Sequence, residues 1–152
     1  MLSKQWNLIK GMCLVMNKSY SELIKIKNYY DRFEYLNLHG LVGETTFNSK
    51  RYLNQRLYRS QAWKKIRNQV IIRDNGCDLA SDGFYIADNA KAIVHHINPI
   101  TIEDLINNNP IVYDLENLIL VTHNTHQAIH YGNRSLLQVE FKERTEGDTK
   151  LW

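Results

Sequence analysis

Apolar residues recur at helical spacing in the first part of the chain. Their side chains are three or four positions apart, so they fall on one face of an α-helix: Leu23, Ile26, Tyr30, Phe33 and Leu36. Ser19 and Glu22 stand before them at the spacing of a capping box, and Gly40 follows as a stop. The pattern predicts one helix between Ser19 and Gly40, with an apolar face that packs on a core.

A second apolar stripe at helical spacing consists of Trp63, Ile66 and Val70. Ser60 can cap this helix, and Asn75-Gly76 can end it. The helix lies within residues 50–73, the most basic stretch of the chain, which contains no acidic residue. A charge run is usually a solvated helix face. A surface that contacts phosphates is the alternative that the lack of acids favours.

A third helix is predicted from Thr122, a capping residue, to Gly132, a stop. His126 and His130 are four residues apart on it, so both imidazoles share one face, with Cβ atoms about 6 Å apart. Histidine is the commonest metal ligand and the side chain best able to move a proton near neutral pH. This pair therefore indicates a metal site.

The segment 91–97 is predicted to be a strand, and it carries His95 and His96. Neighbouring strand residues point to opposite faces, so the two should not both bind one ion. We expect one of them to ligate the metal and the other to face a water molecule or the substrate. His39 and His123 are given no chemical role.

The composition describes an ordinary globular protein with a mildly basic balance. The chain has 152 residues, 43% of them hydrophobic and 23% charged, with a net charge of +3. One compact domain is expected from this length. Cys13 and Cys77 form no disulfide framework, which favours a reducing, cytoplasmic compartment. The apolar run 12–16 is too short to span a bilayer, and we expect no signal peptide and no membrane segment.

The ordered set His95-His96, Asn117 and His126-x-x-x-His130 resembles the HNH nuclease motif, also called the ββα-metal or His-Me finger. The resemblance covers roughly residues 58–132. It implies an α+β fold in which an N-terminal helical segment leads into a ββα-metal domain. The second strand would be 118–122, after a linking segment with a short helix at Thr101. Arg73-Asp74-Asn75-Gly76-Cys77 resembles the Arg-Asp-x-x-Cys pattern that precedes the motif in the family.

The resemblance also implies the chemistry and the role of each residue. His95, His126 and His130 would hold one divalent metal ion, and His96 would be the general base. Asn117, which could also be an ordinary turn residue, would secure the loop and orient that base. Three imidazoles suit zinc, nickel or manganese better than magnesium. The expected activity is the hydrolysis of DNA phosphodiester bonds, which leaves a 3′-hydroxyl and a 5′-phosphate.

The chain departs from those family members that carry a structural zinc on two CxxC pairs. It keeps Cys77, but Ala80, Thr122 and Thr125 stand where the other three cysteines would fall. One thiolate cannot make a tetrahedral zinc site, so we expect no structural zinc and a fold held by packing alone.

The resemblance is closest to small phage HNH proteins, some of which work beside the packaging terminase, so DNA and a terminase are the expected partners. Two alternatives stay open: a non-cleaving DNA-binding packaging accessory protein, and a purely structural zinc module. The predicted division is an N-terminal helical segment at 1–49, the HNH domain at 50–135 and a C-terminal tail at 136–152. The residues expected to contact DNA are Lys64, Lys65, Arg67, Arg73 and Arg134.

Overall fold

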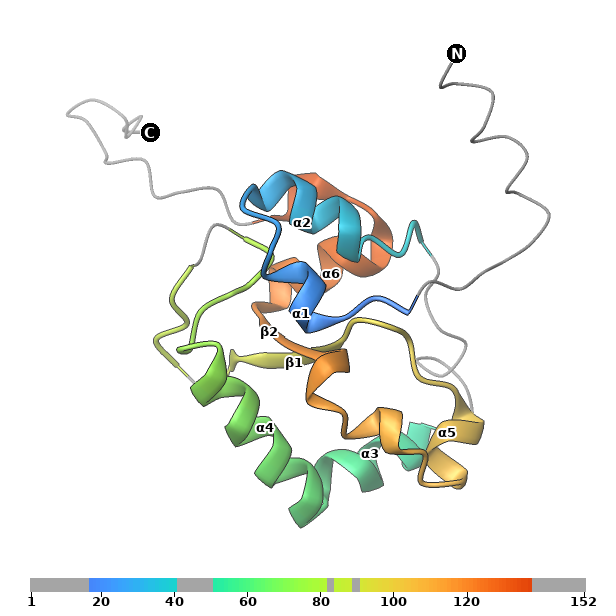
Figure 1. Ribbon diagram of the computed structural model, residues 1–152. Coiled ribbons are helices and arrows are strands. Elements are labelled where there is room, and N and C mark those ends of the chain that lie inside the picture. The colour runs from blue at the N-terminus through green and yellow to red at the C-terminus, as the bar shows by residue number, and fades with distance from the viewer. Residues whose placement is uncertain (1–16, 41–50, 82–83, 89–90, 138–152) are drawn as a thin grey trace, which may run out of the picture.

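The computed structural model describes residues 17–40, 51–81, 84–88 and 91–137. The predicted boundary at 41–49 and the tail beyond residue 137 lie outside these ranges. The elements are α1 (Tyr20–Leu23), α2 (Tyr29–Leu36), α3 (Arg51–Arg59), α4 (Gln61–Arg73), β1 (Ile93–His96), α5 (Ile102–Ile106), β2 (Leu118–Val121) and α6 (His123–Tyr131) (Figure 1). The described residues also form the 3-10 turns η3 (Pro110–Val112), η4 (Leu115–Asn117) and η5 (Arg134–Leu136). This mixture of helices with one small sheet confirms the α+β expectation.

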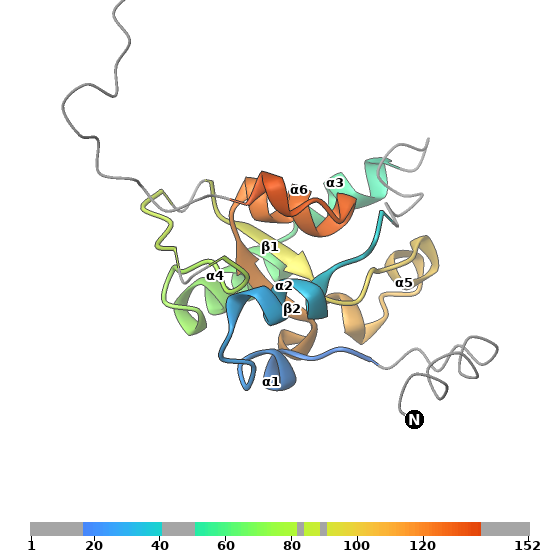
Figure 2. The ribbon, with the colours of Figure 1, turned by 90° about the horizontal axis from the view of Figure 1, so that it is seen from above.

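The sheet has two antiparallel strands and lies between two groups of helices (Figure 1). Ile93 pairs with Val121 and His96 with Leu118. All four residues of β2 are fully buried, which means that both faces of this strand are covered. Helices α1, α2 and α6 cover one face, and α3, α4 and α5 cover the other (Figures 1 and 2).

Alternation along β2 divides the core into two clusters. Ile119 and Val121 lie in the cluster under α6, together with Leu23, Phe33, Leu36, Ala128 and Ile129. Leu118 and Leu120 lie in the cluster under α3 and α4, together with Leu57, Trp63, Val70 and Val112. Because residues of α1 and α2 share a cluster with β2 and α6, the described part of the predicted N-terminal segment has no core of its own.

The single helix predicted after Ser19 is wrong, because the chain forms two helices there. Ser19 caps α1, where its Oγ accepts from the Glu22 amide, but the Glu22 carboxylate accepts from the Tyr35 hydroxyl rather than closing the capping box. Asn28 interrupts the helix by capping α2, where its side chain accepts from the Tyr30 amide at 2.8 Å. Asparagine competes for backbone donors in this way, which is why it favours helix starts.

The local signals around α4 and α5 are confirmed. Ser60 caps α4, and the chain turns after it at Asn75 and Gly76, both with positive φ. Thr101 and Asp104 form a closed capping box at α5. The described ranges contain no helix long and apolar enough to cross a lipid bilayer.

A buried carboxylate joins the segment of Cys77 and Ala80 to the segment of Thr122 and Thr125, the four positions compared above with zinc-binding cysteines. Asp78 is fully buried, and its Oδ1 accepts from the amides of Ala80 and Ser81 at 2.9 and 3.0 Å. Its Oδ2 accepts from the Thr122 amide at 2.7 Å. The expectation that packing alone holds this region is therefore wrong. Hydrogen bonds to Asp78 hold the 77–81 loop against the start of α6.

Candidate metal centre

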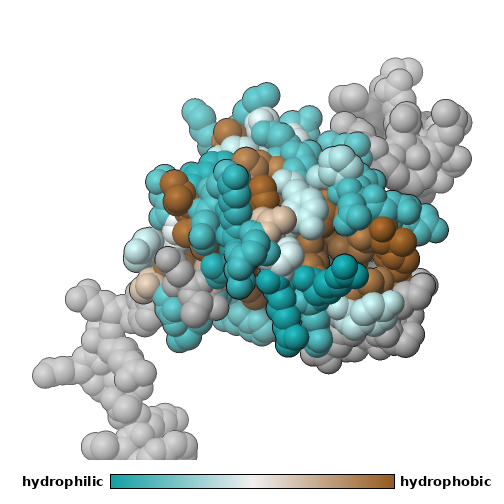
Figure 3. Space-filling model, turned by 90° about the horizontal axis from the view of Figure 1, so that it is seen from below, coloured by the Kyte–Doolittle hydropathy of each residue, from teal (hydrophilic) through white to brown (hydrophobic). Residues whose placement is uncertain are grey.

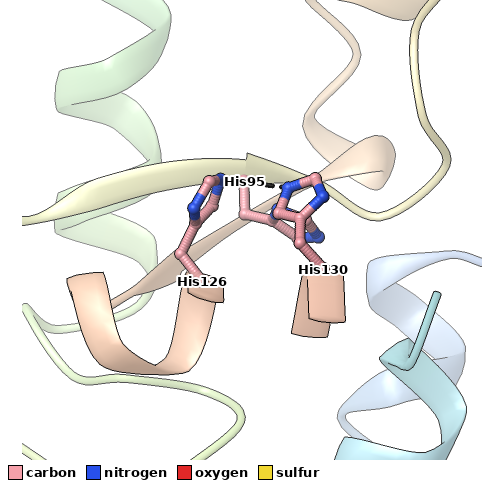
Figure 4. A group of neighbouring side chains, drawn as sticks. All are labelled: His95, His126 and His130. Carbon is pink, nitrogen blue, oxygen red and sulfur yellow. Dashed lines mark hydrogen bonds between the residues drawn. The ribbon is translucent and has the colours of Figure 1, made fainter. Parts of the chain in front are cut away.

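Three histidine side chains converge between β1 and α6 (Figure 4). His95 projects from β1 toward the helix, while His126 and His130 project from adjacent turns of α6 toward the strand. Thr122 starts this helix by accepting from the Thr125 amide, and Gly132 ends it in the left-handed conformation. The helix therefore has the extent that the sequence predicted, which places both of its histidines on the face that meets β1.

The spacing of the ring nitrogens fits one bound ion. The Nε2 atoms of His126 and His130 are 3.2 Å apart. Two nitrogens bound tetrahedrally to zinc at about 2.0–2.1 Å would be about 3.3 Å apart. One nitrogen from each of the three rings lies within 4.8 Å of the others. An ion that binds all three thus requires His95 to approach the helix pair by about 1.5 Å at most.

Two ring nitrogens of the trio are buried without a hydrogen-bond partner in the described structure: His95 Nε2 and His130 Nδ1. A buried polar atom without a partner costs about 1–3 kcal/mol. A metal ion would give His95 Nε2 its missing partner. It would not satisfy His130 Nδ1, since a histidine that ligates through Nε2 carries its proton on Nδ1 and needs an acceptor there.

The surroundings keep these imidazoles neutral, as metal ligands must be. Burial lowers the pKa of His95 well below its usual value, with further lowering from His126 and His130. Burial, followed by the neighbouring His130 and His123, lowers the pKa of His126 to about 4. Burial also lowers the pKa of His130. At neutral pH an ion would therefore displace few protons on binding.

His96 lies on the other face of β1, away from the trio. Its ring stacks on the indole of Trp63 with ring centroids 5.5 Å apart, and only 8% of the residue is exposed. Its Nε2 is 3.0 Å from the carbonyl oxygen of Val112. Because a carbonyl can only accept, Nε2 carries the hydrogen, and the lone pair of the neutral ring is on Nδ1. Burial lowers the pKa of His96, and the Val112 carbonyl partly opposes this.

Asn117 ties together the ends of the segment between the strands. The residue is buried, and its side-chain oxygen accepts from the backbone amide and the side chain of Asn98, both at 2.8 Å. Its side-chain nitrogen donates to the carbonyl of Ile111 at 3.4 Å. Ile111 precedes Val112, whose carbonyl oxygen lies 3.0 Å from His96 Nε2. Asn117 thus contacts the loop that fixes the orientation of His96 and does not touch the imidazole itself.

The basic residues predicted to contact DNA differ in their exposure and in their hydrogen bonds within the protein. Lys64 and Lys65 are exposed on α4, which covers the same face of the sheet as His96, and this side of the molecule is largely hydrophilic (Figure 3). Arg67 is half-buried and donates to the Ala92 carbonyl at 3.0 Å. Arg134 is exposed in η5.

Arg73 is the exception, because all three of its guanidinium nitrogens are engaged within the protein. It forms an ion pair with Asp74 at 2.7 Å and donates to the carbonyls of Leu115 and Leu118. Its guanidinium also lies 3.5 Å from the ring centroid of Tyr20. These contacts give Arg73 a structural role, and its contact with a phosphate stays a prediction. The Arg-Asp pair is structural here, and Asp74 Oδ2 also accepts from the Leu120 amide of β2.

The remaining histidines lie outside the trio. His123 is exposed in the first turn of α6, and His39 is exposed with a φ of 51°. The sequence reasoning missed Val112 as a partner of His96 and treated Trp63 only as part of an apolar stripe. Neither role has a local signal, because both contacts join residues distant in the chain.

No protein-family model, no curated protein and no solved structure matches this chain. The resemblance to HNH nucleases therefore rests on the motif residues themselves.

Proposed function

We propose that this protein is a metal-dependent endonuclease of the HNH type that hydrolyses phosphodiester bonds in DNA. The observation that carries the proposal is the convergence of His95, His126 and His130 from one strand and one helix. His96 follows His95 on the same strand, faces the opposite side, and has its Nε2 atom 3.0 Å from the Val112 carbonyl oxygen. The order strand β1, strand β2, helix α6 is the order that a ββα-metal domain requires.

Each side chain has a distinct part in this proposal. The trio would hold one divalent ion, with zinc, nickel or manganese preferred over magnesium because all three ligands are neutral nitrogens. A bound ion would polarise a phosphate oxygen and stabilise the leaving 3′ oxygen. His96 Nδ1 would accept the proton of the attacking water, since Nε2 already donates to Val112. Asn117 and Trp63 would keep that ring in place.

A nicking assay on supercoiled plasmid tests the proposal. Purified protein is stripped of metal and reloaded separately with zinc, nickel, manganese or magnesium. Reloaded wild type should convert the plasmid to the nicked or linear form, and His96→Ala should bind the same metal without cutting. His123→Ala is the matched control, because His123 lies outside the trio, and it should cut like wild type. Cutting that persists in His96→Ala would refute the assignment of the base.

One observation favours a second function, a DNA-binding packaging accessory protein that holds metal and does not cut. Only 8% of His96 is exposed, and Trp63 stacks on its ring, so water has limited access to it. This candidate predicts one metal ion per chain and DNA affinity, with no nicking in any metal. The context of phage packaging and a terminase partner rests, for both candidates, on the resemblance to small phage HNH proteins.

A further inference from the structure

The guanidinium of Arg134 lies over an aromatic ring of the N-terminal helices. Its guanidinium carbon is 3.6 Å from the ring centroid of Tyr30 in α2 and 5.8 Å from that of Phe33. Phe33 is fully buried, while Tyr30 is half exposed. The N–H bonds of a guanidinium lie in the plane of that group, so a guanidinium stacked on a ring can still direct them outward to a ligand.

Within the described ranges an arginine guanidinium also lies over a tyrosine ring in two other places, and there it donates hydrogen bonds within the protein. Arg73, over Tyr20, bonds to Asp74 and to two backbone carbonyls. Arg32, over Tyr29, donates to the carbonyls of Ile26 and Leu79.

Arg134 differs from both. Its guanidinium makes no hydrogen bond or ion pair with any residue in the described ranges, where its contacts are those with the Tyr30 and Phe33 rings. It is therefore a cation that lies over an aromatic ring and keeps its donors available to a ligand.

The two elements that carry this stack are held against each other at a second point. The Leu38 amide, just after α2, donates to the Ile129 carbonyl of α6 at 3.1 Å. Asn37 lies so close to Gly132 that a Cβ there would be 3.1 Å from its side-chain oxygen. Gly132, which ends α6 at a φ of 65°, therefore permits both the turn into η5 and the close approach of the segment after α2.

We propose that Arg134, held by Tyr30, contacts a backbone phosphate of the DNA bound at the histidine centre. A planar guanidinium with free N–H groups matches two phosphate oxygens, and stacking reduces the side-chain entropy lost on binding. Arg134 follows His130 by four residues, so their Cα atoms are at most about 14 Å apart. At a rise of about 3.4 Å per nucleotide, the phosphate lies within a few nucleotides of the cleaved bond. Tyr30 is then a positioning residue, and α2 forms part of the DNA-binding surface.

This inference rests on the proposed function, in which the protein binds DNA. Measurements of DNA binding can show the failure of the Arg134 inference separately from the failure of that function. The full chain, with metal removed so that the DNA stays intact, is titrated against a fluorescent duplex at several salt concentrations. Each phosphate contact contributes about 0.9 to the slope of log affinity against log salt, which is about eightfold in affinity for each tenfold change in salt concentration. Arg134→Gln should lower the slope by about 0.9. Tyr30→Leu should give at least half of that loss, and Tyr30→Phe should bind like wild type.

The double variant shows whether Tyr30 acts through Arg134. Adding Tyr30→Leu to Arg134→Gln should cause no further loss of affinity, and the thermal midpoints of all variants are measured alongside. If Tyr30→Leu weakens binding equally with and without Arg134, or if both single variants keep the wild-type slope, the inference is overturned. A wild type with no measurable DNA affinity would overturn the proposed function as well.

Discussion

Replacement of Asp78 by alanine should destabilise this protein strongly, although Asp78 is distant from the proposed chemistry in the sequence. Its carboxylate accepts from three backbone amides, those of Ala80, Ser81 and Thr122, at 2.9, 3.0 and 2.7 Å. The loop and the helix start that it joins carry the positions at which the zinc-bearing family members have cysteines. In the described structure the Asp78 carboxylate thus connects the two segments that a zinc ion connects in the zinc-bearing HNH proteins.

The magnitude follows from these contacts. A hydrogen bond to a charged group contributes about 1.5–3 kcal/mol, so three of them give about 4.5–9 kcal/mol before any cost is subtracted. Burial raises the pKa of Asp78, and hydrogen bonds from the Thr122 and Ala80 amides and from the Thr125 and Thr122 side chains only partly oppose this. Desolvating the carboxylate therefore offsets part of the gain. We therefore expect Asp78→Ala to lower the free energy of unfolding by about 3–5 kcal/mol.

Asp78→Asn separates the loop contacts from the helix contact. The amide oxygen can still accept from Ala80 and Ser81, but its NH₂ group faces the Thr122 amide and leaves that donor without an acceptor. The expected loss is about 1–3 kcal/mol. Asp31→Ala is the control, because Asp31 is exposed in the first turn of α2, where an acid contributes about 0.3–1 kcal/mol.

Thermal unfolding followed by circular dichroism measures these differences. At about 2–4 °C per kcal/mol for a chain of this length, Asp78→Ala should lower the midpoint by about 6–20 °C. The ranking of the variants should be the same with and without a chelator, because no metal is assigned to this region. A loss below about 1 kcal/mol in Asp78→Ala, or a ranking that disappears on chelation, would refute this account.

Three further predictions concern the site. His96→Ala should lower the single-turnover cleavage rate by about 10²–10⁴-fold and leave metal affinity, measured by calorimetry, unchanged; loss of metal binding would make His96 a ligand. The metal-free protein should lose stability as the pH falls from about 6.5, the ordinary histidine value, to about 4, the lowered pKa of His126. The reason is that the unfolded chain binds more protons than the folded one in this window. Urea unfolding across pH should show this, and a flat profile would contradict the burial of the site. Charge reversal of Lys64 and Lys65 should weaken binding to all DNA sequences alike and reduce its salt dependence. An unchanged slope of log affinity against log salt would show that this face of α4 is solvated and does not contact DNA.

Local signals in the sequence predicted the elements that place the metal ligands. Thr122 and Gly132 set the ends of α6, and the four-residue spacing of His126 and His130 then fixed their shared face. These relations need no knowledge of the rest of the chain, because helix geometry alone determines them.

What the sequence did not predict depends on contacts between distant residues. The Arg73 guanidinium donates to carbonyls more than forty positions away, which no helix pattern could indicate. Asp78 reaches Thr122, and Tyr30 reaches Arg134, in the same way. The break between α1 and α2 did have a local signal, because Asn28 is a favourable capping residue. The apolar residues at helical spacing continue across it, and this pattern favoured a single helix.

The alternation of side chains along β1 determines how the candidate site is divided. His95 faces α6 and the other two imidazoles, whereas His96 faces Trp63 and Val112 on the opposite side. A water molecule activated at His96 can attack a phosphate bound at the trio only if that phosphate lies beside both faces of the strand. In the described structure β1 pairs with β2 alone, so its other edge carries no strand. A phosphate at that edge can be approached from both faces, and a third strand there would separate the two imidazoles. The proposed chemistry thus places the phosphate at this edge of the described sheet.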